Sequence, residues 1–290
     1  MEEILNIGSD GQVTACFDYG DSSEVLFFHH ATQVAGPISR LMKQLADTHK
    51  IRIIEIVRPG YGNSSSRPGR SIMDVAPVNL QIADHYGIER FGVIGYSGGA
   101  PHALASTSLS QQRCIGTVVV AGMAPLIGSD FDFYDGMDEA NVQEWVGSQN
   151  DIAKFQSEIG QHAKQWSSYD FEKLKSIFNS GSGTPLSETW ISEFATNNQY
   201  SLQQGAEGIL EDSLAFLKPW GFSLSSIESP VQIWAGDVDV IAPASHARWL
   251  HQNIEESELH ILEGKDHNSV VEPSWEAGFK WLRTCFDAAN

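Results

Sequence analysis

The sequence predicts an α/β protein in which a mostly parallel sheet is flanked by helices and carries an inserted helical segment. Short apolar runs alternate with amphipathic stretches along most of the 290 residues, as in proteins built from strand–helix–strand units. The alternation breaks once, because about a hundred residues from 123 to 222 contain no convincing strand. These two observations fix the predicted fold class.

Six segments are predicted to be strands because they are short, rich in β-branched or aromatic residues, and bounded by turn residues. They are Glu24 to Phe28, Ile51 to Val57, Phe91 to Ile94, Ile115 to Ala121, Val231 to Ala235 and Glu258 to Leu262. Segments with helical spacing lie between and after them: Ile38 to Thr48, Ser71 to His85, Pro101 to Ser108, Pro243 to Gln252 and Pro273 to Phe286. Pro77 is expected to kink or interrupt the second helix.

The inserted segment differs in character from the rest of the chain. Residues 123–222 hold 15 of the 29 aromatic residues, and 5 basic side chains against 15 acidic ones. We therefore expect residues 1–122 and 223–290 to form one core domain and residues 123–222 a helical cap. Aromatic residues at helical spacing usually mean packing. A cap over the carboxyl ends of the strands would also wall an apolar substrate pocket, since ligands bind there in this architecture.

Composition excludes several classes of protein. With 18 basic and 37 acidic side chains the net charge is −19, which disfavours binding to nucleic acids and to anionic membranes. Three scattered cysteines without a CxxC pair argue against a disulfide framework or a thiolate metal site. The amino terminus lacks the features of a signal peptide, and no apolar run reaches the roughly 20 residues of a membrane span. We expect a cytoplasmic protein.

A GxSxG motif, Gly95-Tyr96-Ser97-Gly98-Gly99, stands between a predicted strand and a predicted helix. A serine at the tip of such a sharp turn needs strained backbone angles and small neighbours, and the flanking glycines supply them. The helix that follows directs its free N–H groups toward whatever the serine binds. This context predicts that Ser97 is a nucleophile, whereas the motif alone would also fit an ordinary glycine-rich turn.

A serine hydroxyl needs a base to remove its proton. In this strand–turn–helix arrangement the base is expected late in the chain, after the acid that orients it. Among the last histidines, His246 and His251 fall in a predicted helix and His260 in a predicted strand. His267 instead follows that strand in a loop, where its side chain can reach Ser97, and is predicted to be the general base.

The acid is expected in the loop after the strand Val231 to Ala235. Two candidates, Asp237 and Asp239, occur there. The spacing Gly236-x-x-Asp239 favours Asp239, and Asp237 is interpreted as a turn residue that bonds its own backbone. An acid after the strand that ends at Ala121 is an alternative, but residues 122–128 contain no carboxylate.

Stabilising a developing oxyanion takes two backbone donors. The N–H of Gly98, next to the nucleophile, is predicted to be one, and the N–H of Ala31, after the first predicted strand, the other. The pair His29-His30 also suggests a metal site. Adjacent histidines on an extended chain point in opposite directions, however, and no third ligand is near in sequence, so we predict no metal and no cofactor.

These residues and four longer segments resemble the α/β-hydrolase fold superfamily over nearly the whole chain, and within it a bacterial subgroup of serine hydrolases. The segments are Arg58-Pro59-Gly60-Tyr61-Gly62-Asn63-Ser64, SGGAPHALA from Ser97, Lys218-Pro219-Trp220-Gly221-Phe222 and AGDVDVIAPASHARWL from Ala235. The resemblance implies an α/β-hydrolase fold with the triad Ser97, Asp239 and His267, the oxyanion donors Ala31 and Gly98, and a cap. The family usually has His-Gly where this chain has His29-His30, and Gly-His where it has Asp266-His267.

Residue types narrow the chemistry that the resemblance implies. Haloalkane dehalogenases and epoxide hydrolases use an aspartate nucleophile, and prolyl aminopeptidases carry a tryptophan where this chain has Gly98. The prediction is a hydrolase that cleaves a carboxylic ester, lactone or thioester of a small, partly apolar molecule through an acyl-Ser97 intermediate. The alternatives are a cofactor-independent dioxygenase, a C–C bond hydrolase and a low-turnover ligand receptor. The sequence leaves a homodimer open.

Overall fold

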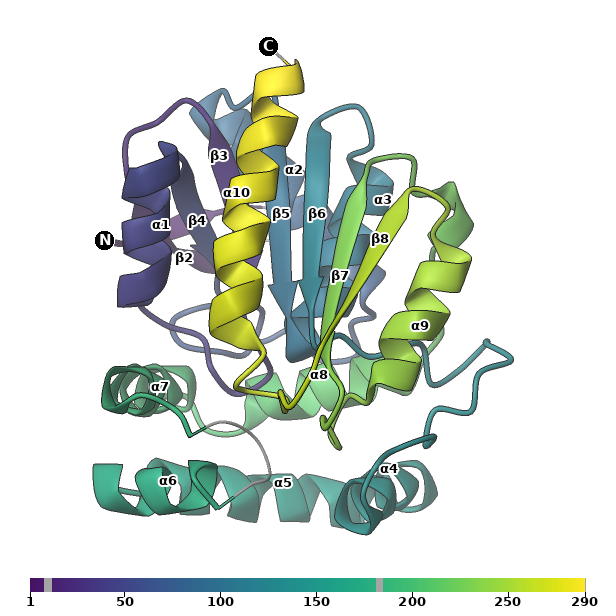
Figure 1. The fold of residues 1–290 in the computed structure, drawn as a ribbon. Helices are drawn as coiled ribbons and strands as arrows, with labels where there is room; N and C mark the ends of the chain where they lie inside the picture. The colour runs from purple at the N-terminus through teal and green to yellow at the C-terminus, as the bar shows by residue number, and fades with distance from the viewer. Residues whose placement is uncertain (8–11, 181–184, 290) are drawn as a thin grey trace.

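An eight-stranded, mostly parallel sheet forms the centre of the structure, a computed structural model that describes residues 1–7, 12–180 and 185–289 (Figure 1). Its strands are β1 (Glu2–Asn6), β2 (Val13–Tyr19), β3 (Val25–His29), β4 (Arg52–Ile56), β5 (Phe91–Tyr96), β6 (Cys114–Val120), β7 (Val231–Gly236) and β8 (Ser257–Leu262). Their order across the sheet is β1-β2-β4-β3-β5-β6-β7-β8, and every pair from β4 to β8 is parallel. The predicted fold class is confirmed.

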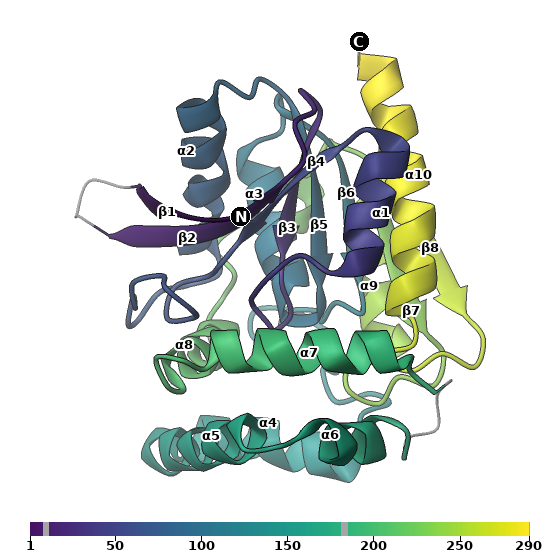
Figure 2. The same cartoon turned by 90° about the vertical axis from the view of Figure 1, so that its left-hand side faces the viewer.

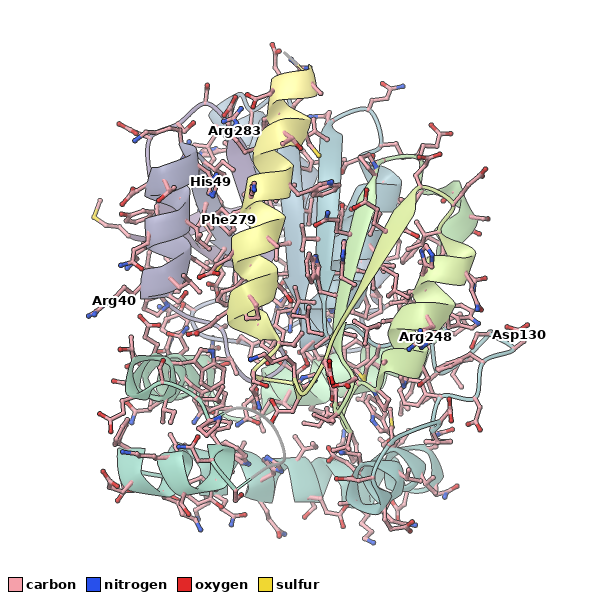
Figure 3. All side chains as sticks on the ribbon, viewed as in Figure 1. Arg40, His49, Asp130, Arg248, Phe279 and Arg283 are labelled. Atoms are coloured by element: carbon pink, nitrogen blue, oxygen red, sulfur yellow. The ribbon has the colours of Figure 1, made fainter. Side chains whose placement is uncertain are left out.

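Helices cover both faces of the sheet (Figures 1 and 2). One face packs against α1 (Arg40–His49) and α10 (Val271–Ala289), and the other against α2 (Ala76–Tyr86), α3 (Ala100–Leu109) and α9 (Ala244–Asn253). Figure 3 shows His49 and Phe279 side by side where α1 meets α10, with their ring centroids 6.4 Å apart. Strands buried on both faces explain the nearly continuous apolar runs in the sequence.

Five helices lie between β6 and β7 in the chain and gather beyond the end of the sheet at which β5 ends (Figures 1 and 2). They are α4 (Glu139–Asn150), α5 (Ile152–Ser167), α6 (Phe171–Phe178), α7 (Glu188–Ser201) and α8 (Glu207–Phe216). In Figure 2, α7 and α8 lie nearer the sheet than α4, α5 and α6. These helices occupy the segment for which a cap is predicted, and the division into domains stays a prediction.

The structure differs from the sequence prediction at two places. The antiparallel strands β1 and β2 at the edge of the sheet were not predicted. β1 begins with two glutamates and is mostly exposed, so its residues lack the usual strand signal. The helix predicted from Ser71 is split into the short 3₁₀ helix η1 (Met73–Val75) and α2, with Pro77 in the first turn of α2. Proline is tolerated there because the first N–H groups of a helix need no partner.

A buried ion-pair cluster ties α8 to the core. Asp212 of α8 lies 2.7 Å from Nη2 of Arg58, which follows β4, and 2.5 Å from Nη2 of Arg70, and all three side chains are fully buried. The Tyr61 hydroxyl also donates a hydrogen bond to this carboxylate, at 2.8 Å. Burial by itself would raise the pKa of Asp212, but the charges of Arg58 and Arg70 outweigh it and hold that pKa well below its usual range.

Replacing Asp212 should therefore destabilise the fold. We expect Asp212→Asn to lower the free energy of unfolding at pH 7 by about 3–5 kcal/mol, because Arg58 is left buried without a counter-charge and Arg70 keeps only Glu211, at 3.3 Å. A carboxylate whose pKa falls on folding stabilises the protein above its unfolded pKa of about 3.9 and loses that effect as the pH drops. The gap between variant and wild type in urea denaturation should thus narrow below about pH 4.

The matched control is Asp84→Asn, which breaks the pair of Asp84 with Arg113 at 2.6 Å. Asp84 is 71% exposed, so water replaces the lost partner and the change should be far smaller. Equal losses in the two variants would contradict the role assigned to the buried cluster.

Candidate active site

Ser97 occupies a strained turn between β5 and α3. Its backbone φ is 51°, in the left-handed region that side chains other than glycine rarely adopt. The two flanking glycines allow the close packing that holds this turn. A Cβ on Gly95 would lie 2.7 Å from the carbonyl oxygen of Gly99, and a Cβ on Gly99 would lie 2.1 Å from that of His29. The turn has the geometry that the GxSxG motif predicts.

Ser97, His267 and Asp239 form a chain of hydrogen bonds. The Oγ of Ser97 lies 2.8 Å from Nε2 of His267, and Nδ1 of the same ring lies 2.8 Å from Oδ2 of Asp239. Asp239 is 3% exposed, and its other oxygen accepts the N–H groups of Ile241 at 2.8 Å and Ala242 at 2.9 Å. These bonds fix the carboxylate, which in turn orients the imidazole toward the serine.

The competing candidates lie elsewhere. Asp237 accepts the N–H of Gly264, 27 residues further along the chain, at 2.7 Å, so the interpretation that it bonds its own turn was wrong. His246 accepts the N–H of Ala124 at 3.0 Å, His251 lies 2.8 Å from Oγ of Ser257, and His260 stacks on Trp234 with centroids 4.0 Å apart. None of these contacts involves Ser97. Among the candidate acids and bases, the structure brings only His267 and Asp239 into a hydrogen-bond chain with Ser97.

Asp266, the unusual neighbour of the candidate base, bonds within its own loop. Its Oδ1 accepts the N–H groups of Asn268 at 3.2 Å and Ser269 at 2.8 Å, and the Ser269 hydroxyl at 2.7 Å. The carboxylate thus shapes the turn that carries His267 into α10.

The two predicted oxyanion donors lie on adjoining segments. A Cβ on Gly98 would lie 3.2 Å from the backbone nitrogen of Thr32, so the turn after Ser97 touches the loop after β3. Ala31 of that loop lines the same cavity as Ser97. The N–H groups of Gly98 and Ala31 are therefore candidates to point at one position beside the nucleophile.

His30 and Arg58 hold this loop in place. Nε2 of His30 accepts the backbone N–H of Arg58 at 3.1 Å, so its proton sits on Nδ1, which donates to the carbonyl oxygen of Ala31 at 2.7 Å. The guanidinium of Arg58 also donates to the carbonyl oxygen of His30. Burial lowers the pKa of His30 well below its usual value, which keeps the ring neutral. The second histidine of the pair is thus a buried structural residue that fixes the loop containing Ala31.

His29 faces a different environment. Its Nε2 lies 3.3 Å from the hydroxyl of Ser106 on α3, and burial lowers the pKa of this ring well below its usual value as well. Within the described part of the chain, no group of three or more His, Cys, Asp or Glu side chains is arranged to hold a metal ion.

Two lobes of a cavity meet at Ser97. One, of about 220 Å³, is walled by α1, α10 and the aromatic side chains of α5, α6 and α7, and it also contains His267. The other, of about 280 Å³, extends toward α4, α5 and α8. Thr32, Gln33, Ser97 and Ile241 line both lobes. Ser97 therefore stands at the junction of the two lobes.

Two polar residues of the cavity, Thr32 and Glu55, were not predicted from the sequence. The hydroxyl of Thr32 is buried and has no hydrogen-bond partner within the described residues. Glu55 of β4 is 1% exposed and lines the lobe beside α1. The sequence does contain an indication of Glu55. It is a charged residue in the middle of the apolar run Ile51 to Val57, and a charge is unusual inside a buried strand.

The chain belongs to the alpha/beta hydrolase fold family, whose profile matches residues 25–273. It is 26% identical over 223 residues to the uncharacterized hydrolase YcgS of Bacillus subtilis. The alignment covers 74% of this chain and 75% of YcgS. Within residues 1–7, 12–180 and 185–289, no helix is both long and apolar enough to cross a membrane.

Solved structures share the fold at low sequence identity. An esterase from Exiguobacterium antarcticum has a TM-score of 0.73 and 17% identity, with 98% of both chains covered. A bromoperoxidase from Bacillus anthracis has a TM-score of 0.71 and 18% identity, covering 99% of this chain and all of that one. An epoxide hydrolase from Vigna radiata has a TM-score of 0.68 at 17% identity, with 98% of both chains covered.

The geometry makes Ser97 a target for a fluorophosphonate, a reagent that reacts with activated serines. We expect labelling of Ser97, and a roughly 10³- to 10⁴-fold slower reaction in Asp239→Asn, because an amide favours the wrong histidine tautomer. The matched control, Asp237→Asn, should label at nearly the wild-type rate. Mass spectrometry of the labelled peptides gives both rates, and a greater effect at Asp237 would show that the orienting carboxylate is misassigned.

Proposed function

We propose that the protein is a serine hydrolase that cleaves a carboxylic ester, or a related lactone or thioester, of a small and partly apolar molecule. The observation that carries this proposal is the continuous hydrogen-bond chain from Ser97 through His267 to Asp239, with 2.8 Å at each link. Such a chain converts a weakly nucleophilic hydroxyl into one that can attack an acyl carbon.

The first half of the reaction forms an acyl-enzyme. The Oγ of Ser97 attacks the carbonyl carbon while Nε2 of His267 takes its proton. Asp239 stabilises the imidazolium that results. The developing oxyanion accepts hydrogen bonds from the N–H groups of Gly98 and Ala31. His267 then gives its proton to the leaving alcohol, and the acyl group remains on Ser97.

The second half regenerates the enzyme. Water enters the place of the alcohol, His267 removes one of its protons, and the hydroxide attacks the acyl carbon. Collapse of the second tetrahedral intermediate returns the proton to Ser97 and releases the carboxylic acid. The side chains of Ser97, His267 and Asp239 and the N–H groups of Gly98 and Ala31 carry every step, in line with a reaction that needs no cofactor.

The cavity supports a small substrate with apolar parts. Trp166, Phe178, Trp190 and Phe194 of the helices beyond the sheet wall the lobe beside α1, together with Trp275 of α10. Burial of apolar surface against these rings would supply binding free energy, and the two lobes would receive the acyl and alcohol portions on either side of Ser97. The physiological partner is accordingly a small molecule.

Hydrolysis of a short-chain p-nitrophenyl ester tests the proposal. We expect the wild-type protein to release p-nitrophenol and Ser97→Ala to lose at least about three orders of magnitude in rate, as removal of a triad serine does. Glu276→Gln, a substitution at an exposed position of α10, serves as the control and should leave the rate unchanged.

Two results would contradict the proposal. Oxygen uptake with an N-heteroaromatic substrate that persists in Ser97→Ala would identify a cofactor-independent dioxygenase. Full ester hydrolysis in Ser97→Ala would show that the reaction does not pass through this serine.

A further inference from the structure

Glu55 is a buried carboxyl group among aromatic rings beside the candidate nucleophile. In the sheet it lies opposite Phe17 of β2 on one side and Phe28 of β3 on the other. Directly paired residues of neighbouring strands project to the same face, so these rings flank the carboxyl group. Tyr200 packs on Phe17 with centroids 5.1 Å apart, and Trp275 packs on Phe28 at 5.8 Å.

One half of this carboxyl group lacks a partner in the protein. Its Oε1 accepts the N–H of Gly36 at 3.0 Å, and within the described residues no donor is bonded to Oε2. Glu55 lines the lobe that contains Ser97, so the unpartnered oxygen belongs to the wall of a ligand cavity. Burial raises the pKa of Glu55 to about 8, against the opposing effects of the Gly36 N–H and the charge of Arg58.

The lobe is suited to a positive charge. Glu193 of α7 and Glu272 of α10 also line it, whereas no Lys or Arg is among its described lining residues. Arg58 is already paired with Asp212. Arg40 is the first residue of α1, and its side chain points outward from the fold in Figure 3. Its backbone N–H, and not its guanidinium, bonds to Glu193. Aromatic faces attract cations, and the walls of the lobe carry several.

We propose that this lobe binds an ammonium group of the substrate, with Glu55 as its ion-pair partner and the surrounding rings as its walls. The inference rests on the proposed function and narrows it to esters whose acyl or alcohol part carries a protonated amine. A purely structural role would need only an acceptor for Gly36, which a glutamine supplies. Ionisation of a carboxyl group at this buried place is costly unless a cation compensates the charge.

Binding to the Ser97→Ala protein tests the site without depending on turnover. The probes are n-hexylammonium and hexan-1-ol, which differ only in the charged group, measured by calorimetry at pH 8. We expect n-hexylammonium to bind at least about tenfold more tightly, the effect of a hydrogen bond to a charged group. Glu55→Gln keeps the acceptor for Gly36 and should abolish this preference, whereas the exposed Glu276→Gln should not.

Proton release separates an ion pair from a neutral hydrogen bond. The titratable and charged groups around Glu55 are Arg58 after β4, Tyr200 and Glu193 of α7, Glu272 of α10 and the loop residue His267. Binding of n-hexylammonium at pH 7 should release close to one proton, because Glu55 must ionise. Calorimetry in buffers of different ionisation enthalpy measures the number of protons released on binding. This proton release should be absent in Glu55→Gln.

The outcomes discriminate between the inference and the proposed function. Equal affinities for the two probes, or a preference that survives Glu55→Gln, would overturn the inference. A preference lost only in Glu193→Gln would overturn the assignment of Glu55. Comparing p-nitrophenyl 6-aminohexanoate with p-nitrophenyl heptanoate then tests turnover in the wild-type protein. If neither ester is hydrolysed while the Glu55-dependent binding holds, the proposed function fails and the ammonium site stands.

Discussion

The left-handed backbone of Ser97 is the constraint on which the rest of the site depends. Holding a residue other than glycine in this conformation costs on the order of 1–3 kcal/mol, so the surroundings must enforce it. They do so through contacts that leave no room for a Cβ at Gly95 or Gly99. The same turn brings Oγ to His267 and places the backbone of Gly98 against the loop after β3.

That loop is coupled to the helices beyond the sheet through one buried side chain. Arg58 donates to the carbonyl oxygen of His30 and forms an ion pair with Asp212 of α8. Arg58 therefore joins the loop that contains Ala31 to a helix that lines the second lobe of the cavity.

The sequence predicted the features that rest on local signals. GxSxG located the strained turn, and the spacing after β7 selected Asp239 over Asp237, because the carboxyl ends of parallel strands bring such loops together. Features set by distant pairing were out of reach. The environment of Glu55 depends on its register with Phe17 and Phe28, and Arg58 meets a partner 154 residues away. β1 is only weakly apolar, so its position in the sheet depends on its pairing with β2, which the local sequence does not indicate.

Detection of an acyl-enzyme on Ser97 is the decisive measurement for the proposed reaction. The protein would be mixed with p-nitrophenyl acetate, quenched in acid within the first turnovers, digested and examined by mass spectrometry. We expect an acetyl group on the peptide that contains Ser97, formed together with an initial burst of p-nitrophenol. Steady release of p-nitrophenol with no burst and with Ser97 unmodified throughout would contradict it.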